Sequence, residues 1–292
     1  MSRAEPNSVE RRLVFAAMTT VDLIQIAESL PHPGDKAATT SSHIDVGGPA
    51  ANAAITAAVL GSATSLLTVI GSGPLSGFAR NVLEDHGVAV CEQGSAASLP
   101  VSSVWVDGRS GERTILATDN SNVDAAALPG PLLPDGTLAI LLDGHYASIT
   151  RAIASEAHEK GIPIVLDCGR WRPVYEDLLP LASDIIMCAT FRPPELAGAD
   201  QHTAVSSIHN TWQPELCAMT RGPRSILVGG EDRVAEIPVP AVDAVDTTGA
   251  GDVLHGAYLY HRYSAGLAAA EALERAAQLA AQSCAHLGVR PV

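Results

Sequence analysis

Short apolar runs alternate with segments of helical character along most of the chain, and this alternation limits the fold more than any other feature. The expected strands cover residues 13–18, 65–70, 138–142, 162–166, 184–187 and 225–228, and the expected helices include 50–60, 78–86, 149–160 and 174–181. Strands that alternate with helices form mostly parallel sheets covered on both faces. The sequence therefore predicts an α/β fold, with one domain over residues 1–292.

Two segments break this rhythm. Residues 39–46 alternate with β-branched character after a loop at 30–36, and residues 101–117 alternate around a Gly-containing turn typical of a β-hairpin. We expect these segments, about 36–46 and 101–117, to pair with each other as a small separate sheet. Asp22 follows the first strand, and the structural alternative to a binding role is a solvated acid in a loop.

The composition excludes several classes of function. A content of 47% hydrophobic residues is enough for a sizeable core, and a formal net charge of −14 disfavours nucleic acid and anionic membranes as partners. The polar N-terminus and the lack of a long apolar run argue against a signal peptide and a membrane span. The five cysteines and ten histidines form no zinc pattern, so we expect reduced thiols in a cytoplasmic protein.

The strongest local motif is Asp-Thr-Thr-Gly-Ala-Gly-Asp at residues 246–252, followed by an apolar segment. Gly249 and Gly251 mark the start of a helix, where free amides and the helix dipole suit a phosphate group. Asp252 would lie in the first turn, and a carboxylate there can take the proton of a hydroxyl that attacks phosphorus. The structural alternative is that Thr248 caps the helix and Asp252 offsets its dipole.

A second glycine pair, Gly47 and Gly48, precedes a helix that carries Asn52 in its first turn. The glycine amides and Asn52 could hold the hydroxyls of a small polyol, whereas a tight turn with a helix cap explains the same residues equally well. Residues 71–77 do not form a dinucleotide fingerprint, because their glycine spacing is wrong and includes Pro74, and the chain has no P-loop motif.

Both glycine motifs resemble the signatures of the PfkB (ribokinase-like) carbohydrate kinases and stand in the order expected for that family. The resemblance spans about residues 13–288. It implies that Asp252 is the catalytic base and that the amides of Gly249, Ala250 and Gly251 form an anion hole. It also implies that the first motif and the acid after the first strand bind the sugar, through Asp22, Gly47, Gly48 and Asn52.

The family fold is a three-layer α/β/α sandwich with a mostly parallel central sheet and a small β-lid over the sugar. The two interrupting segments fall where this lid is expected, and the lid could also join two copies in a homodimer. The motifs look most like those of the ketohexokinase and sulfofructose-kinase branches. In these branches, Lys36 and His145 stand where groups that bind one end of the substrate occur.

The resemblance also implies that ATP is the phosphoryl donor, with Mg²⁺ bridging its phosphates. Nucleotide contacts are expected from Thr220, Gly222, Thr248 and Gly288, and Asp246 matches one side of the family's K⁺ site. One departure concerns the Asn-x-x-Glu motif with which many members place magnesium and phosphates. In this chain, Ala189 and Arg192 occupy the two ends of that motif.

Together these features predict an ATP-dependent kinase that phosphorylates a primary hydroxyl of a small sugar, with a ketohexose favoured. One alternative is a nucleoside kinase of the same fold. Another is a catalytically silent sugar-binding regulator, since the Asn-x-x-Glu motif is altered while Asp252 is intact.

Overall fold

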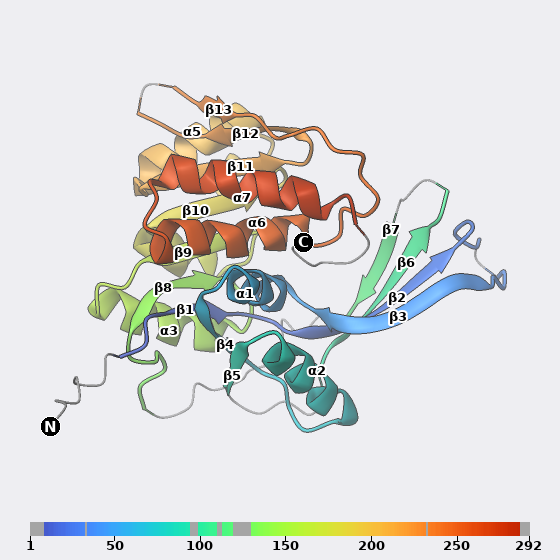
Figure 1. Cartoon of the computed structure of the whole chain (residues 1–292). Coiled ribbons are helices and arrows are strands. Elements are labelled where there is room, and N and C mark those ends of the chain that lie inside the picture. The colour runs from blue at the N-terminus through green and yellow to red at the C-terminus, as the bar shows by residue number, and fades with distance from the viewer. Residues whose placement is uncertain are drawn as a thin grey trace, which may run out of the picture.

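A large sheet forms the centre of the molecule in the computed structural model, which describes residues 9–32, 34–93, 99–109, 113–118, 130–231 and 233–286 (Figure 1). Its strand order is β13-β12-β11-β10-β9-β8-β1-β4-β5. The strands are β1 (Arg12–Ala16), β4 (Ala63–Thr68), β5 (Val88–Glu92), β8 (Thr137–Leu142), β9 (Ile164–Cys168), β10 (Asp184–Cys188), β11 (Leu216–Arg221), β12 (Arg224–Val228) and β13 (Ala235–Ile237). Neighbouring strands pair in parallel along the row β11, β10, β9, β8, β1, β4 and β5, and β12 and β13 add antiparallel pairs at one edge.

Helices cover both faces of this sheet. The helices on one face are α1 (Pro49–Val59), α2 (Pro74–Asp85), α6 (Ala250–Leu259) and α7 (Ala269–Ser283), and those on the other are α3 (Ala147–Glu159), α4 (Tyr175–Leu178) and α5 (Gln201–Trp212). A hydrophobic core lies on each face of the sheet, and successive residues of β1 point into the two cores alternately. Leu13 and Phe15 pack on the face with α1 and α6, whereas Val14 and Ala16 pack on the opposite face. The predicted three-layer α/β/α arrangement is therefore confirmed.

Helix α2 begins earlier than the sequence pattern predicts. We expect it from residue 78, but it starts at Pro74. Proline is well suited to the first helical position, since its missing N–H would have no partner there and its φ angle already matches a helix. Of the segment 71–77, only residues 71–73 therefore belong to the turn between the strand and the helix, which is shorter than predicted.

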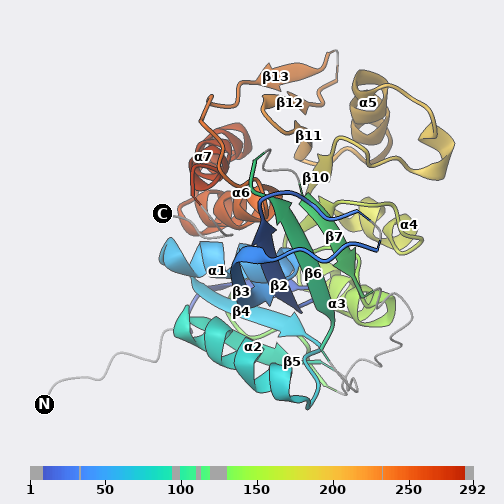
Figure 2. The same ribbon diagram turned by 90° about the vertical axis from the view of Figure 1, so that its right-hand side faces the viewer.

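A second sheet extends away from the large one, with strand order β3-β2-β6-β7 (Figures 1 and 2). Its strands are β2 (Thr20–Ala27), β3 (Thr39–Gly47), β6 (Val101–Asp107) and β7 (Arg113–Ala117). The expectation that segments 36–46 and 101–117 pair with each other is wrong, because β2 lies between them, antiparallel to β3 and parallel to β6. Strand β2 escapes the sequence pattern because Leu23 and Ile24 are adjacent, which breaks the alternation of period two.

All five cysteines are free thiols. Cys168, Cys217 and Cys284 are buried, and burial raises the pKa of the Cys217 thiol to about 12. In the part of the chain that the structure describes, no helix has the length and apolar character needed to cross a membrane.

Candidate active site

Helix α6 begins at the edge of the large sheet where the parallel strands end, the usual place for a ligand site in such sheets. Its N-cap residue, Gly249, has a φ of 70°, a left-handed conformation that favours glycine. No side chain caps this helix, so the structural alternative that Thr248 is the cap is wrong. Asp252 lies in the first turn, as predicted. The first amides of a helix have no carbonyl partner within it, and the uncapped turn offers them to a ligand.

The two glycine motifs meet at Asp252. The side-chain amide of Asn52, in the first turn of α1, donates to Oδ2 of Asp252 at 2.7 Å across 200 residues of sequence. Burial raises the pKa of Asp252 to about 8, the nearby Asp167, Asp22 and Asp143 act in the same direction, and the hydrogen bond from Asn52 opposes them. A carboxyl that titrates near neutral pH is suited to proton transfer.

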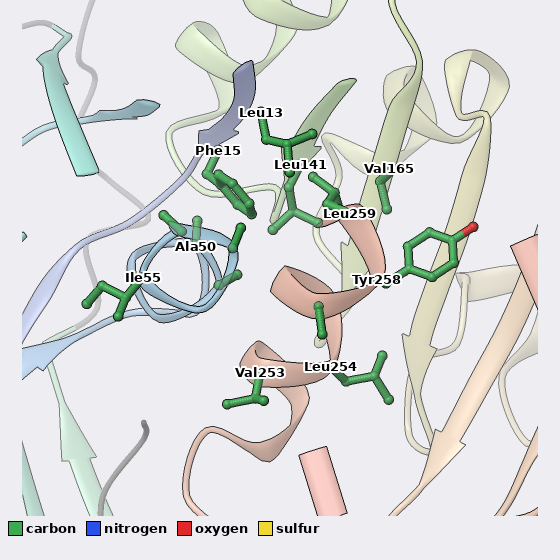
Figure 3. Packing of buried hydrophobic residues seen from close by; sticks show 14 of the residues in the cluster. Leu13, Phe15, Ala50, Ile55, Leu141, Val165, Val253, Leu254, Tyr258 and Leu259 are labelled. Atoms are coloured by element: carbon green, nitrogen blue, oxygen red, sulfur yellow. The ribbon is translucent and has the colours of Figure 1, made fainter. Parts of the chain in front are cut away.

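A close contact between α1 and α6 holds these two helix ends together. A Cβ atom at Gly256 would lie 2.2 Å from the carbonyl oxygen of Ala53 and 2.7 Å from Cβ of Thr56, so only glycine fits there. Val253 and Leu254 of α6 belong to the same buried cluster as Ala50 and Ile55 of α1 (Figure 3). The contact therefore fixes the distance between the helices that carry Asn52 and Asp252.

Asp22 approaches the first glycine pair from β2. The structural alternative of a solvated loop acid is wrong for Asp22, since it pairs within the small sheet. A Cβ atom at Gly47 would lie 2.1 Å from Oδ2 of Asp22, and Gly48, with a φ of 101°, packs against the carbonyl of Met18. Burial raises the pKa of the Asp22 carboxyl, while a hydrogen bond of 2.8 Å from Thr20 opposes this. Asp22, Gly47, Gly48 and Asn52 are thus neighbours at one side of Asp252.

His145 lies at the same sheet edge, just after β8. Its Nδ1 is 2.8 Å from Oδ2 of the buried Asp143, and its Nε2 is 2.6 Å from the guanidinium of Arg172. Because arginine only donates, Nε2 accepts and Nδ1 carries the hydrogen that faces Asp143. The contact of Nδ1 with Asp143 is close but lacks hydrogen-bond geometry, whereas Nε2 is occupied by Arg172, whose guanidinium keeps further donors.

Lys36 does not join this cluster. It precedes β3 and is exposed, and it lines a hollow of about 420 Å³ with Gln25 and Trp105. In β2, Gln25 lies an odd number of residues from Asp22, so these side chains point to opposite faces of the small sheet. Lys36 therefore lies toward the distal end of that sheet, on the face away from Asp22.

The residues expected near the nucleotide are only partly placed. Thr220 lies near the carboxyl end of β11. Gly222, with a φ of 62°, lies in the turn that follows this strand. Asp246 accepts a hydrogen bond of 2.8 Å from the main-chain amide of Thr248, which shapes the loop before Gly249. Gly288 lies outside the described residues.

The two positions after β10 that match the ends of the Asn-x-x-Glu motif carry no carboxylate for a metal ion. Ala189 stands there with Arg192, whose guanidinium donates to the main-chain oxygens of Ala189, Phe191 and Ala199. Within the described ranges, no three His, Cys, Asp or Glu side chains are grouped so as to hold a metal ion. The side chains of the described residues therefore do not form a complete set of magnesium ligands. This does not conflict with a magnesium-dependent reaction, because magnesium is often held mainly by substrate phosphates and water.

The small sheet touches the loop that precedes α6. Arg113, at the start of β7, donates to the hydroxyl of Thr247 at 2.6 Å. Thr247 precedes Gly249 by two residues, so the contact joins the small sheet to the loop that opens α6.

Three polar residues of this region were not predicted from the sequence: Asp167, Arg172 and His255. Asp167 lies near the end of β9 and contributes to the raised pKa of Asp252. The sequence contains one signal for Asp167, because this residue directly follows the apolar run 162–166. Polar residues at the carboxyl ends of parallel strands lie near the ligand site of such sheets. Arg172 and His255 have no comparable local signal.

The profile of the pfkB family carbohydrate kinases matches residues 10–292. The chain belongs to the pfkB family. Among its relatives, a ribokinase of Haemophilus influenzae is 24% identical over 238 residues, covering 78% of this chain and 77% of the relative. A fructokinase of Klebsiella pneumoniae is 28% identical over 264 residues, covering 82% and 84%.

Solved structures of this pfkB fold are similar to the present one over nearly the whole chain. The ribokinase of Thermotoga maritima gives a TM-score of 0.76 at 18% identity, covering 96% of this chain and 94% of that one. An adenosine kinase of Anopheles gambiae gives a TM-score of 0.75 at 17% identity, covering 96% and 97%. The ribokinase-like fold is therefore confirmed, and the small sheet is consistent with the lid of that fold. These proteins are named for different phosphoryl acceptors, namely ribose, fructose and adenosine. The comparisons therefore identify the family of this chain but not its substrate.

Proposed function

We propose that this chain transfers the γ-phosphoryl group of ATP to a primary hydroxyl of a small sugar. The hydrogen bond between Asn52 and Asp252 carries this proposal, because it joins the sugar-binding motif to the candidate base. The relatives are named for ribose, fructose and deoxyribose. Their names therefore do not favour a ketohexose over a pentose as the acceptor.

In the proposed reaction, Asp22, Gly48 and Asn52 bind hydroxyls of the sugar. The Asp252 carboxylate accepts the proton of the attacking hydroxyl as its oxygen forms a bond to the γ-phosphorus. The bond from that phosphorus to the bridging oxygen breaks, and ADP leaves. Amides at the start of α6, at Gly249 to Gly251, would balance the charge on the transferring group.

The nucleotide would lie along the loop before α6 and beside Thr220 and Gly222, which stand on the same edge of the sheet. Magnesium would neutralise charge on the phosphates, held through phosphate oxygens and water. A K⁺ ion beside Asp246 belongs to the same proposal. Closure of the small sheet over the sugar would exclude water and limit wasteful hydrolysis of ATP.

An ADP-release assay with a panel of sugars and adenosine tests this proposal. The panel contains ribose, deoxyribose, fructose and other ketohexoses. Asp252→Asn should lower kcat by about 10²–10⁴-fold with the best acceptor, the usual effect of losing a general base. Asp243→Asn is the matched control, since Asp243 is exposed in the preceding loop and should leave kcat unchanged.

The same assay separates the alternatives. A kcat/KM for adenosine above that for every sugar would support a nucleoside kinase of this fold. Binding of a sugar without release of ADP would instead support a silent sugar-binding regulator, the alternative motivated by Ala189 and Arg192.

A further inference from the structure

Tyr175 begins the short helix α4, is fully buried, and places its hydroxyl between the ends of two strands. The hydroxyl oxygen is 2.8 Å from the carbonyl oxygen of Asp143 and 2.7 Å from that of Asp167. A carbonyl oxygen only accepts, so the single hydrogen of the hydroxyl serves two acceptors. Burial raises the pKa of this phenol well above its usual range, so the hydroxyl keeps its hydrogen at neutral pH.

This hydroxyl joins β8 and β9 at the point where their pairing stops. The two strands pair in parallel as far as Leu142 and Leu166. Asp143 and Asp167 are the residues that follow, and their carbonyls meet at the hydroxyl. Two buried carbonyl oxygens without a donor between them would repel each other and leave acceptors unsatisfied. The hydroxyl therefore holds the carboxyl ends of β8 and β9 together, at the edge of the sheet that carries the candidate site.

Packing leaves the ring of Tyr175 little freedom to move. Its centroid lies 6.0 Å from that of Trp171 and 5.3 Å from that of Phe191, and the second pair meets edge to face. On another side the ring contacts Gly144, where a Cβ atom would lie 2.9 Å from Cζ of the tyrosine. The position of the hydroxyl is therefore fixed by the surrounding residues and not by its hydrogen bonds alone.

The two acids that follow the paired residues belong to the surroundings of Asp252. Asp143 is 2% exposed, and its carboxylate accepts a hydrogen bond of 2.9 Å from the main-chain amide of His145, so this side chain follows the main chain of its turn. Burial is the main cause of the raised pKa of Asp252, and Asp167 and Asp143 act in the same direction. The spacing of β8 and β9 therefore affects the charge near the proposed base.

Several elements contribute titratable or hydrogen-bonding groups around Asp252. They are Asp22 of β2, Asp143 after β8, Asp167 of β9 and His255 of α6, with His145 and Arg172 beside Asp167 and the uncharged Asn52 of α1. Of these groups, Asp143 and Asp167 are the two whose carbonyls accept from Tyr175.

We propose that Tyr175 is a positioning residue of this site: its hydroxyl joins β8 to β9 and so keeps Asp143 and Asp167 close to Asp252. The proposal rests on the kinase function proposed above. Without the hydroxyl, the strand ends separate, and the two acids move away from Asp252 or become hydrated. Either change weakens their repulsion of the Asp252 carboxylate, so this carboxyl should lose its proton at a lower pH.

Tyr175→Phe tests this proposal, because it keeps the ring and removes the hydroxyl. With the best acceptor, we expect the midpoint of kcat/KM against pH to lie below that of the wild type. Tyr263→Phe is the matched control, since it also removes a hydroxyl bound to a buried acid, Asp184, at the start of β10 and hence at the opposite edge of the sheet. Both variants should have a lower Tm, but the control should keep the wild-type midpoint. A midpoint that stays in place or rises in Tyr175→Phe overturns the proposal.

A second substitution tests whether Tyr175 acts through the two acids. Asp143→Asn removes one charge and keeps the shape of the side chain, so it should also lower the midpoint. Because part of the effect of Tyr175 passes through Asp143, the double variant should shift the midpoint by less than the sum of the two single shifts. Fully additive shifts contradict the proposal.

A spectroscopic test needs no acceptor. In protein labelled with ¹³C-aspartate, the carboxyl signal of Asp252 is assigned by its loss in Asp252→Asn. This signal should titrate with a pKa of about 8 in the wild type and at a lower pH in Tyr175→Phe. Equal titration in the two proteins overturns this proposal, whether or not a sugar is phosphorylated. Failure of every acceptor would overturn the proposed function instead.

Discussion

At the scale of single residues, Asp252 determines how activity should vary with pH. Its pKa is raised to about 8, mainly by burial, so the carboxylate that accepts a proton predominates only above that pH. We expect kcat/KM to rise through the neutral range and to level off at higher pH. Asn52→Ala removes a hydrogen bond that stabilises the carboxylate, so the midpoint of the profile should move upward. A midpoint that stays in place or moves to lower pH contradicts this assignment.

The same carboxyl should weaken the folded state at neutral pH. Its pKa rises from 3.8 to about 8 on folding, so the folded protein binds this proton more tightly than the unfolded chain does. The free energy of unfolding should therefore fall as pH rises between these two values. Asp252→Asn removes this loss, so its Tm should exceed that of the wild type near pH 8 and approach it in acid. Thermal unfolding across pH measures the difference, and Asp243→Asn should show none.

At the scale of elements, the contact between α1 and α6 should be sensitive to a single methyl group. Gly256→Ala places a Cβ atom against the main chain of Ala53, which should cost about 1–3 kcal/mol and separate Asn52 from Asp252. Both the free energy of unfolding and kcat should fall. Gly77→Ala in α2 is the control, because no atom lies within 4 Å of the new Cβ, and it should stabilise by about 0.5–1 kcal/mol. Equal stability of the two variants would refute the steric argument.

The sequence predicts those elements whose causes are local. The glycine that opens α6 and the apolar runs of the large sheet follow from backbone preference and periodicity, and both are confirmed. The place of β2 between β3 and β6 depends on pairing between distant segments, which no local pattern contains. For the same reason, the sequence could not place Lys36 away from Asp22 or bring His255 beside Asp167.

At the scale of the whole molecule, one face of the small sheet is suited to contact with a second copy. The register places Leu23, Ile44, Ser103 and Leu116 on this face, and Ile44 and Leu116 are 53% and 63% exposed. The paired residues of this face that lie nearer the large sheet are uncharged: Val21, Leu23, Gln25, Ser42, Ile44, Val46, Val101, Ser103, Trp105, Thr114 and Leu116. Charged groups lie at its distal end, where Asp107 pairs with Ala27 and where Asp35 and Lys36 line the hollow beside Gln25. In a chain of net charge −14, the uncharged part of this face can meet its copy with little charge repulsion.

We therefore expect a homodimer that forms through this face. Light scattering after gel filtration should give the mass of two chains for the wild type and of one chain for Leu116→Asp, since the new carboxylates would be buried against each other. The control is Ile115→Asp, because Ile115 is also exposed but points to the opposite face. A wild-type protein that stays monomeric at every concentration contradicts the expectation.

The hydrogen bond between Asn52 and Asp252 also has a consequence for synthesis. Its partners are 200 residues apart, so a nascent chain that already carries the sugar-binding motif still lacks the proposed base. Domains tend to fold from the N-terminus as the chain emerges, and contacts between distant segments form late. Until α6 leaves the ribosome, the groove that it fills beside α1 exposes the apolar surface of Ala50 and Ala53. A message cut short before this helix would thus yield a chain that cannot perform the proposed reaction and has an open core.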